Sequence, residues 1–229
     1  MSRQPVLRAA LAAAVLGLAT GARAQVPPSA DEARAYRGLH AAAQKGDVQA
    51  IAGASAAALQ ARDAHGRTPL HVAAFARQRE AIRALAAAGA DLNALEDDRY
   101  DAVTIAAVAD DEATLRTLLA LGARAGQTTS RYDGTALIAA AHLGHDGVVR
   151  QLIAAGAPLD HVNNLHWTAV IESIVLGDGG PRHQATLKAL IDAGANLQLA
   201  DAQGRTPLAL ARGRGYEAMA RMLEQAGAR

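Results

Sequence analysis

The sequence contains no cysteine and very few aromatic residues. Its 229 residues include one Phe, one Trp and four Tyr, although 51% of the chain is hydrophobic. The absence of cysteine excludes a disulfide framework, a thiolate metal site and a cysteine nucleophile. A globular core of this size usually takes much of its buried area from aromatic side chains. A chain that relies on Ala and Leu instead is typical of closely stacked helices.

Neither sign of charge dominates the sequence. Lys and Arg total 23 and Asp and Glu total 22, which gives a formal net charge of +1. A nucleic-acid-binding domain usually carries a clear excess of basic residues, so we expect no nucleic-acid partner. An acidic tail is also absent from the sequence.

The first 24 residues differ from the rest of the chain. Arg3 and Arg8 make the N-terminal region basic, and Ala9–Ala19 is an uncharged apolar run. Ala22–Ala24 then gives the small-x-small pattern of a cleavage site. The run is too short to span a bilayer, which takes roughly 20 residues. We predict a Sec-type signal peptide, residues 1–24, that is cleaved after Ala24. The alternative is an N-terminal amphipathic or membrane-anchoring helix.

Cleavage at this point defines the mature protein. It removes three arginines, so the formal charge changes from +1 to −2 (+1 − 3). We predict a leader segment at residues 25–33, extended over Gln25–Ala30, followed by a single repeat domain at 34–229. The protein is then periplasmic or secreted, with no membrane association after cleavage.

A short motif recurs along the chain at a nearly constant spacing. Thr68-Pro69-Leu70-His71 recurs in part as Thr206-Pro207-Leu208, and three weaker copies lie between them. The copies begin at residues 68, 101, 135, 168 and 206, so successive starts are 33, 34, 33 and 38 residues apart. A Gly-Ala pair follows 21 residues after four of these starts and 26 after Thr168. This period indicates stacked helical repeats.

Each position of the motif has a physical reason. Thr caps the first helix by accepting a backbone N–H, and Pro at the first helical position loses no needed hydrogen bond. Leu faces the core, and an Ala pair lets two helices pack closely. The polar stretch before each Thr, such as Asp63–Arg67, forms a β-turn finger. The left-handed C-caps of the second helices are predicted at Gly89, Gly122, Gly156, Gly194 and Gly227.

The pattern resembles the ankyrin-repeat family over residues 34–229. The resemblance implies an all-α solenoid of stacked helix-turn-helix units with β-turn fingers, and we expect a monomer. The first unit, which starts at Leu39, lacks Thr-Pro and has a shortened second helix, as a capping repeat would. We expect six repeats including two terminal caps, at about 34–62, 63–95, 96–129, 130–162, 163–200 and 201–229.

The stretch from Arg131 to Gln184 resembles a group of small exported bacterial ankyrin proteins. Its marks are the segments Tyr132–Leu137, Asp160–Ala169 and Leu176–Gln184. The resemblance implies a non-catalytic periplasmic protein that binds a protein partner, whose identity it does not give. Such proteins are linked to stress protection, although no residue here shows that role. One alternative is an inhibitor or immunity-type partner of a secreted enzyme.

The scarce aromatic residues gather where ankyrin proteins bind their partners. Phe75 follows the Ala pair of an inner helix, whereas Tyr100, Tyr132 and Trp167 lie in successive fingers. Aromatic residues are enriched at binding hot spots. We therefore predict that these four residues, with His142 on an inner helix, contact the partner. The alternative is that the rings merely cover the small Ala helices.

The fifth repeat contains an insertion. Alignment with the fourth repeat isolates Asp178–Arg182 as five extra residues between the two helices, directly before His183. Because Gly-Gly-Pro cannot continue a helix, we predict a protruding loop. Asp178, Arg182 and His183 are therefore further candidate contacts. The loop lacks the Lys-Ser/Thr of a phosphate loop and the carboxylate series of a calcium loop.

The same repeat places a carboxylate where the others are apolar. Glu172 stands at the position of Val72, Ile105, Ala139 and Leu210. A buried carboxylate must be paired, hydrogen-bonded or protonated. We expect His166, Asn164 or Arg182 to anchor Glu172, which would then hold the loop or the preceding finger. The alternative is that Glu172 recognises a cation of the partner.

Metal binding and catalysis have little support in the sequence. A metal or small-ligand site in the fourth and fifth repeats is an alternative because five histidines lie there, but their spacing matches no familiar ligand pattern. Ser130, His142 and Asp133 could be combined on paper into a catalytic triad, yet nothing in their spacing supports it. We predict no cofactor and no metal. The histidines are His142, His145, His161, His166 and His183.

Overall fold

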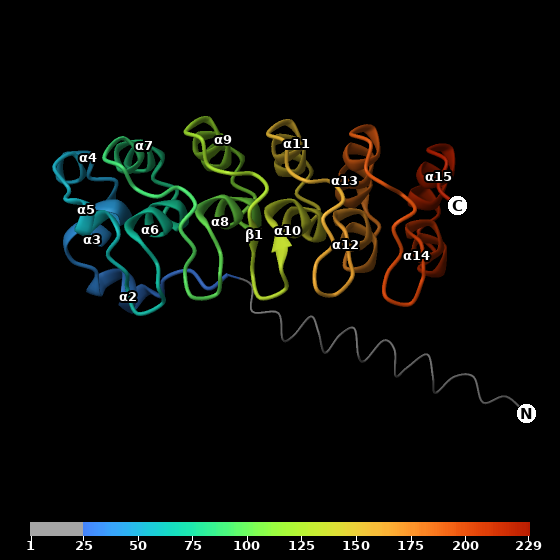
Figure 1. Cartoon of the computed structure of the whole chain (residues 1–229), viewed down its shortest axis with the longest axis horizontal. Coiled ribbons are helices and arrows are strands. Elements are labelled where there is room, and N and C mark those ends of the chain that lie inside the picture. Colours follow the sequence, from blue (N-terminus) through green and yellow to red (C-terminus); the bar gives the residue numbers. More distant parts are fainter. Residues whose placement is uncertain (1–24) are drawn as a thin grey trace, which may run out of the picture.

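The structure, a computed structural model, describes residues 25–229 as a row of helix pairs in two layers (Figure 1). The predicted signal peptide, residues 1–24, lies outside the described residues. The inner helices are α3 (Gly38–Lys45), α6 (Pro69–Phe75), α8 (Ala102–Val108), α10 (Ala136–Leu143), α12 (Ala169–Val175) and α14 (Pro207–Gly213). The outer helices are α4 (Val48–Ile51), α7 (Arg79–Ala87), α9 (Glu112–Ala120), α11 (Asp146–Ala154), α13 (Pro181–Asp192) and α15 (Glu217–Gln225).

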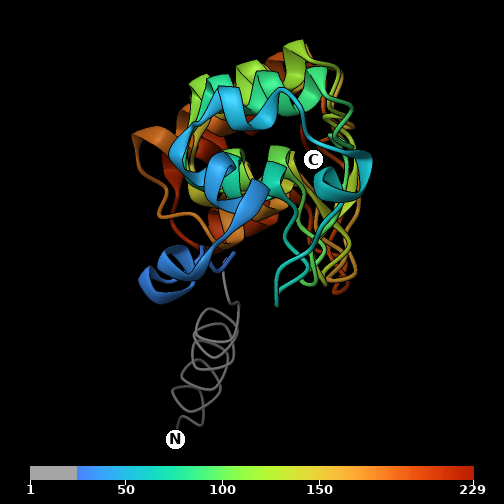
Figure 2. The same ribbon diagram turned by 90° about the vertical axis from the view of Figure 1, so that its left-hand side faces the viewer.

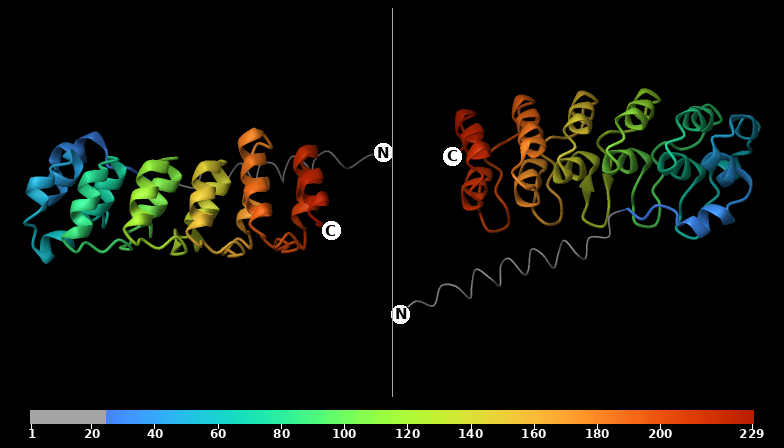
Figure 3. Two further views of the ribbon diagram at one scale, coloured as in Figure 1. Left: turned by 90° about the horizontal axis from the view of Figure 1, so that it is seen from above. Right: turned by 180° about the vertical axis from the view of Figure 1, so that it is seen from behind.

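The six pairs confirm the predicted solenoid. Seen from above and from behind, the pairs follow one another in chain order (Figure 3). The first pair is the shortened one, because α4 has only 4 residues and is followed by the short helix α5 (Ala56–Leu59). None of the helices in residues 25–229 has the length and apolar character needed to cross a membrane.

The core lies between the two layers and continues from repeat to repeat. The residue two places after each cap is buried, as predicted: Leu70, Val103, Leu137, Val170 and Leu208. Ala140 and Ala141, on α10, have no exposed surface and let the helix approach its neighbours. Since each unit packs mainly on the next one, the apolar core is extended along the row.

Caps at both ends of the helices match the sequence pattern. The Asp101 carboxylate accepts the Thr104 N–H at 2.7 Å, and the Thr135 and Thr168 hydroxyls accept N–H groups in their first turns at 3.3 Å. Thr68 differs, since its hydroxyl lies 2.8 Å from Nδ1 of His71. The predicted C-cap glycines have positive φ between 79° and 97°: Gly89, Gly122, Gly156, Gly194 and Gly227.

The fingers project from one side of the helix layers (Figure 2). The concave side is the surface enclosed between the fingers and the inner helices. The finger before α10 is a small antiparallel hairpin of β1 (Thr128–Thr129) and β2 (Gly134–Thr135). In the finger before α6, Asp63 N donates to Arg67 O at 3.1 Å, which confirms the predicted turn. A histidine ring ties neighbouring repeats together, because Nε2 of His71 lies 3.1 Å from the Tyr100 carbonyl oxygen.

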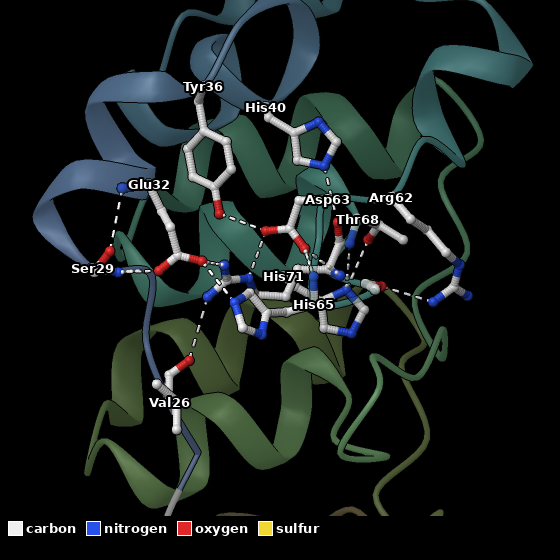
Figure 4. A network of polar contacts seen from close by, with 12 residues as sticks. Val26, Ser29, Glu32, Tyr36, His40, Arg62, Asp63, His65, Thr68 and His71 are labelled. Atoms are coloured by element: carbon white, nitrogen blue, oxygen red, sulfur yellow. Dashed lines mark hydrogen bonds and ion pairs between the residues drawn. The ribbon is translucent and has the colours of Figure 1, made fainter.

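The leader segment is docked on the concave side. It contains the helix α2 (Ala30–Ala35), which crosses the predicted boundary between residues 33 and 34. Arg67, only 2% exposed, donates to Glu32 Oε1 at 2.5 Å and to Asp63 Oδ2 at 2.6 Å. Figure 4 labels both of these acidic residues. Hydrogen bonds from Ser29, and then from Arg67, lower the pKa of Glu32 to about 2, although burial opposes that shift. A buried guanidinium therefore joins the leader to the second repeat.

Candidate functional site

A hollow of about 330 Å³ lies on the concave side of the third to fifth repeats. We call it the concave hollow. The inner helices α8, α10 and α12 and the fingers that precede them supply most of its lining. The lining residues are Gln25, Tyr100, Thr104, Val108, Thr129, Ser130, Tyr132, Gly134, Thr135, Ile138, Ala139, His142, Leu143, Asn163, Leu165, Trp167, Glu172 and Leu176. A hollow of this size matches a small ligand or a few side chains of a partner.

Four of the predicted contact residues meet in this hollow. Tyr100, Tyr132 and Trp167 come from three successive fingers, and His142 comes from α10. All three aromatic rings are partly buried, so part of each remains accessible. Phe75, the fourth predicted aromatic contact, does not line the hollow and packs against the core at the end of α6.

Glu172 lies at the floor of the hollow and is 5% exposed. Its Oε1 accepts a hydrogen bond from Asn163 Nδ2 at 3.0 Å, and its Oε2 lies 3.5 Å from His142 Nδ1. The predicted anchors Asn164, His166 and Arg182 were therefore wrong. Asn164 donates instead to the Arg131 carbonyl oxygen at 3.0 Å.

Burial shifts the ionisation of both groups at this floor. It raises the pKa of Glu172 to about 7, and the hydrogen bond from Asn163 only partly opposes the shift. Burial also lowers the pKa of His142, and the nearby His183 and His145 lower it further. Both changes favour the neutral form, so at pH 7 Glu172 is only about half ionised and the pair is not a fully charged salt bridge.

Asn163 connects the finger to the carboxylate. Its Oδ1 accepts the N–H groups of Leu165 and Trp167, both at 3.0 Å, which fixes the finger turn, while its amide donates to Glu172. An aspartate could fix the turn but could not donate to Glu172. The pairing of Asn163 with Glu172 has a signal in the sequence, because asparagine occurs at this finger position only in the repeat where Glu replaces the apolar helix residue. The equivalent finger positions hold Asp63, Glu96, Ser130, Asn163 and Asp201.

The predicted loop in the fifth repeat is only partly correct. Five residues, 176–180, lie between α12 and α13, compared with two, 144–145, between α10 and α11. Pro181 already begins α13, which has 12 residues compared with 9 in α11, so the rest of the extra length extends the outer helix. A tight turn remains at residues 177–180. Within it the Asp178 carboxylate accepts the Gly180 N–H at 2.8 Å, and Gly179 packs closely on the Tyr216 ring.

The polar residues of the insertion serve the scaffold. Nε2 of His183 lies 2.9 Å from the His142 carbonyl oxygen, and its Nδ1 lies 2.8 Å from Asp178. Arg182 pairs with Asp110 at 2.9 Å and with Asp146 at 3.4 Å. Because Asp178, Arg182 and His183 do not line the concave hollow, the structure does not join them to the aromatic contacts.

The histidines of the fourth and fifth repeats are dispersed. Rings of His145, His161 and His183 each lie within 2.9 Å of a main-chain carbonyl oxygen of an earlier residue. Within residues 25–229, no group of three or more His, Asp or Glu side chains has an arrangement suited to a metal ion. The triad considered on paper is also not assembled, since the Asp133 carboxylate pairs with Arg99 at 2.9 Å.

His166 contributes its backbone to the finger. It has a φ of 61°, and its N–H donates to the Asn163 carbonyl oxygen at 2.9 Å. A left-handed conformation costs a non-glycine residue roughly 1–2 kcal/mol. We therefore expect His166→Gly to raise the free energy of unfolding by about 0.5 to 1 kcal/mol in urea titrations. The reverse change at the equivalent Gly204 (φ 72°), Gly204→Ala, should lower the free energy of unfolding by about 1 kcal/mol. A loss of stability in His166→Gly would show that the imidazole ring stabilises the finger.

The stacked helix pairs and their projecting fingers define a helical repeat protein. The sequence profile of the family "Ankyrin repeats (3 copies)" matches residues 11–96, 103–199 and 137–229. The chain therefore belongs to the ankyrin-repeat family, whose domains are generally non-enzymatic scaffolds that bind proteins.

Relatives and solved structures agree with this assignment. The chain is 35% identical over 190 residues to the putative ankyrin repeat protein YahD of Escherichia coli (strain K12), covering 82% of this chain and 94% of that protein. It is similar to the structure of an ankyrin repeat domain from Acinetobacter baumannii AYE, with a TM-score of 0.77, 42% identity, and coverage of 83% and 98% of the two chains. The ankyrin repeat domain of Bcl-3, a member of the IkappaB protein family, gives a TM-score of 0.74 and 26% identity, covering 85% of this chain and 87% of that one.

Proposed function

We propose that this protein is a non-catalytic interaction protein of the periplasm that binds a protein partner in the concave hollow. The observation that carries the proposal is the distribution of its six aromatic residues. Tyr100, Tyr132 and Trp167 line one hollow from three successive fingers. Such clustering on a rigid concave face is the arrangement expected of a binding hot spot.

The remaining aromatic residues have structural contacts. The Tyr36 hydroxyl donates to Asp63 at 2.7 Å, and the Tyr216 hydroxyl donates to the Gly177 carbonyl oxygen at 2.8 Å. Phe75 packs against the core. The alternative that the three rings of the hollow only cover small helices is less favoured. Each of the three residues stays partly accessible beside a hollow that no side chain of residues 25–229 fills.

The binding proposal is tested by capture of a partner from a native periplasmic extract with crosslinking. We expect the purified mature protein to capture a partner, and Trp167→Ala with Tyr132→Ala to reduce capture at least about 30-fold, since each hot-spot residue contributes about 2 kcal/mol. The control is Arg116→Ala with Arg150→Ala, on the exposed surfaces of α9 and α11, which should capture normally. Equal capture by the double aromatic variant would contradict the site assignment.

Export is proposed on the basis of the N-terminal sequence pattern. Cell fractionation should recover the protein in the periplasm, and N-terminal sequencing of that fraction should begin at Gln25. An unprocessed protein in the cytoplasm would contradict the export proposal without affecting the binding proposal. The identity of the captured partner also decides the alternative role as an inhibitor or immunity-type protein, which requires that the partner be a secreted enzyme.

A further inference from the structure

Glu172 is a buried acidic side chain that no arginine or lysine of residues 25–229 contacts. Within residues 25–229 the only group that reaches it at ion-pair distance is His142, at 3.5 Å, and no arginine or lysine does. Burying a carboxylate away from water is costly unless a cation or several hydrogen bonds compensate for it. An apolar residue at this position, as in the other repeats, would avoid the cost. The carboxylate therefore points to a use outside the scaffold.

One oxygen of this carboxylate is already committed and the other is not. Oε1 accepts the hydrogen bond from Asn163, whereas within the described chain Oε2 accepts none. Glu172 is also one of the residues that line the concave hollow. A molecule in the hollow would therefore meet a carboxylate whose Oε2 accepts no hydrogen bond from residues 25–229 and lies 3.5 Å from His142 Nδ1.

The walls above this oxygen suit a positive charge. Tyr100, Tyr132 and Trp167 line the same hollow. The faces of tyrosine and tryptophan rings attract ammonium and guanidinium groups, with the largest effect for tryptophan. A hollow with aromatic walls and a carboxylate at its floor offers both interactions that an organic cation uses.

We propose that the concave hollow binds the ammonium group of a lysine side chain of the protein partner, with Glu172 as its counter-ion. This inference rests on the proposed function and names the chemistry of the contact. A lysine is favoured over an arginine because a guanidinium is best recognised by two carboxylate oxygens at once, and here Asn163 occupies one of them. A metal ion is not favoured, because one available oxygen is far fewer ligands than such ions need.

The contact should strengthen as pH rises, because Glu172 must lose its proton to pair with the ammonium. His142, on α10, is the titratable group that faces Glu172, and in its neutral form it adds no competing charge. Basic side chains of the neighbouring elements are engaged elsewhere. His183 on α13 bonds the His142 carbonyl oxygen, Arg212 on α14 pairs with Glu224, and Arg214 contacts the Val175 carbonyl oxygen. Cleavage would leave an α-ammonium group on Gln25, which also lines the hollow, so the peptides are tested on a chain whose α-amino group is acetylated.

The test uses the chain from Gln25 and two capped pentapeptides, acetyl-Ala-Ala-Lys-Ala-Ala-amide and the same peptide with norleucine in place of lysine. Trp167, the single tryptophan of the sequence, reports binding through its fluorescence. At pH 8 we expect the lysine peptide to bind at least about ten-fold more tightly than the norleucine peptide. Glu172→Gln should remove most of this preference, leaving only the part that the aromatic rings contribute, without weakening binding of the norleucine peptide. The preference should also fall as the pH is lowered to 5.5.

Several results would overturn the inference. One is equal binding of the two peptides to the wild-type protein, and another is a preference for lysine that is undiminished in Glu172→Gln. A third is n-butylamine binding as tightly as the lysine peptide, which would indicate a free amine as the ligand. Urea unfolding of Glu172→Gln, expected to match or exceed the wild type, checks that the variant is folded. Unchanged capture of the periplasmic partner by Glu172→Gln, together with loss of capture in Trp167→Ala/Tyr132→Ala, would refute the lysine contact while the proposed function stands.

Discussion

Replacing Arg67 by methionine is expected to lower the free energy of unfolding by about 3 to 5 kcal/mol, the range typical for removing one partner of a buried ion pair. The Arg67 side chain is only 2% exposed and contacts two carboxylates, those of Asp63 and Glu32. Methionine retains much of the apolar stem, so the loss reports mainly the missing charge and its hydrogen bonds. Urea unfolding at pH 7 measures the effect.

The last complete finger offers a matched control. Arg205 occupies the same position and donates to Asp201 Oδ2 at 2.7 Å, but its side chain is 46% exposed and contacts no leader segment. Arg205→Met should therefore lower the free energy of unfolding by only about 1 kcal/mol, in line with solvent-exposed ion pairs. Equal losses in the two variants would show that burial of Arg67 between two carboxylates adds no stability beyond that of an exposed ion pair.

The Arg67 variant should also release the leader. The Glu32 carboxylate and the Val26 carbonyl oxygen, which accepts from Arg67 at 3.4 Å, both lose the hydrogen bond from Arg67. We expect faster amide hydrogen exchange over residues 26–36 in Arg67→Met, with little change in the fourth and fifth repeats, because stacked units contact mainly their neighbours. Unchanged exchange over this segment would mean that α2 is held by other contacts.

Replacing Glu172 by glutamine is expected to raise the free energy of unfolding by about 3 kcal/mol above pH 7. The carboxyl has a pKa of about 7 in the folded chain, compared with 4.5 for an unperturbed glutamate. A difference of that size corresponds to roughly 3 kcal/mol. Glutamine keeps the oxygen that accepts from Asn163 and carries no charge to bury.

The sign of the pH dependence follows from the raised pKa. Below pH 4.5 the carboxyl is protonated in both states, so the wild type and Glu172→Gln should be equally stable. As the pH rises to about 7 the unfolded chain loses its proton while the folded chain retains it, and the wild type alone loses stability. The difference between the two proteins, from urea unfolding at pH 4 to 8, should therefore grow over this range and then level off; a constant difference would show that Glu172 ionises normally.

Comparison of the wild type with Glu172→Gln is necessary because another group changes the stability in the opposite direction with pH. Burial lowers the pKa of His71 to about 4. Stability that depends on its neutral ring is present above pH 6.5 and is lost as the pH falls towards 4. This contribution is common to the wild type and Glu172→Gln, so it cancels in their difference.

The repeats could be predicted from the sequence because the same physical requirement recurs at each period. A cap, a core leucine or valine and a left-handed glycine must appear in every unit, so five copies make the pattern readable even where Asp101 replaces threonine. The aromatic wall of the hollow was also predictable, since Tyr100, Tyr132 and Trp167 fall in fingers that project to the same side.

The partner of Glu172 and the path of the insertion could not be predicted in the same way. Which neighbour reaches the carboxylate depends on side-chain direction, and Asn163 is one residue away from the expected Asn164. Gly-Gly-Pro does end one helix, but Pro181 then starts the next, as proline favours at a first helical position. The docked leader was also missed, because its contact with Arg67 joins residues 35 positions apart with no repeat pattern.

The central claim is that the concave hollow of the third to fifth repeats is the binding surface. A photo-reactive amino acid placed at Tyr132, or at Arg116 on the outer helix α9, tests it most directly in intact cells. The account predicts a covalent adduct with a protein partner at position 132 and none at position 116. An adduct at 116 with none at 132 would place the binding surface on the outer helices and contradict it.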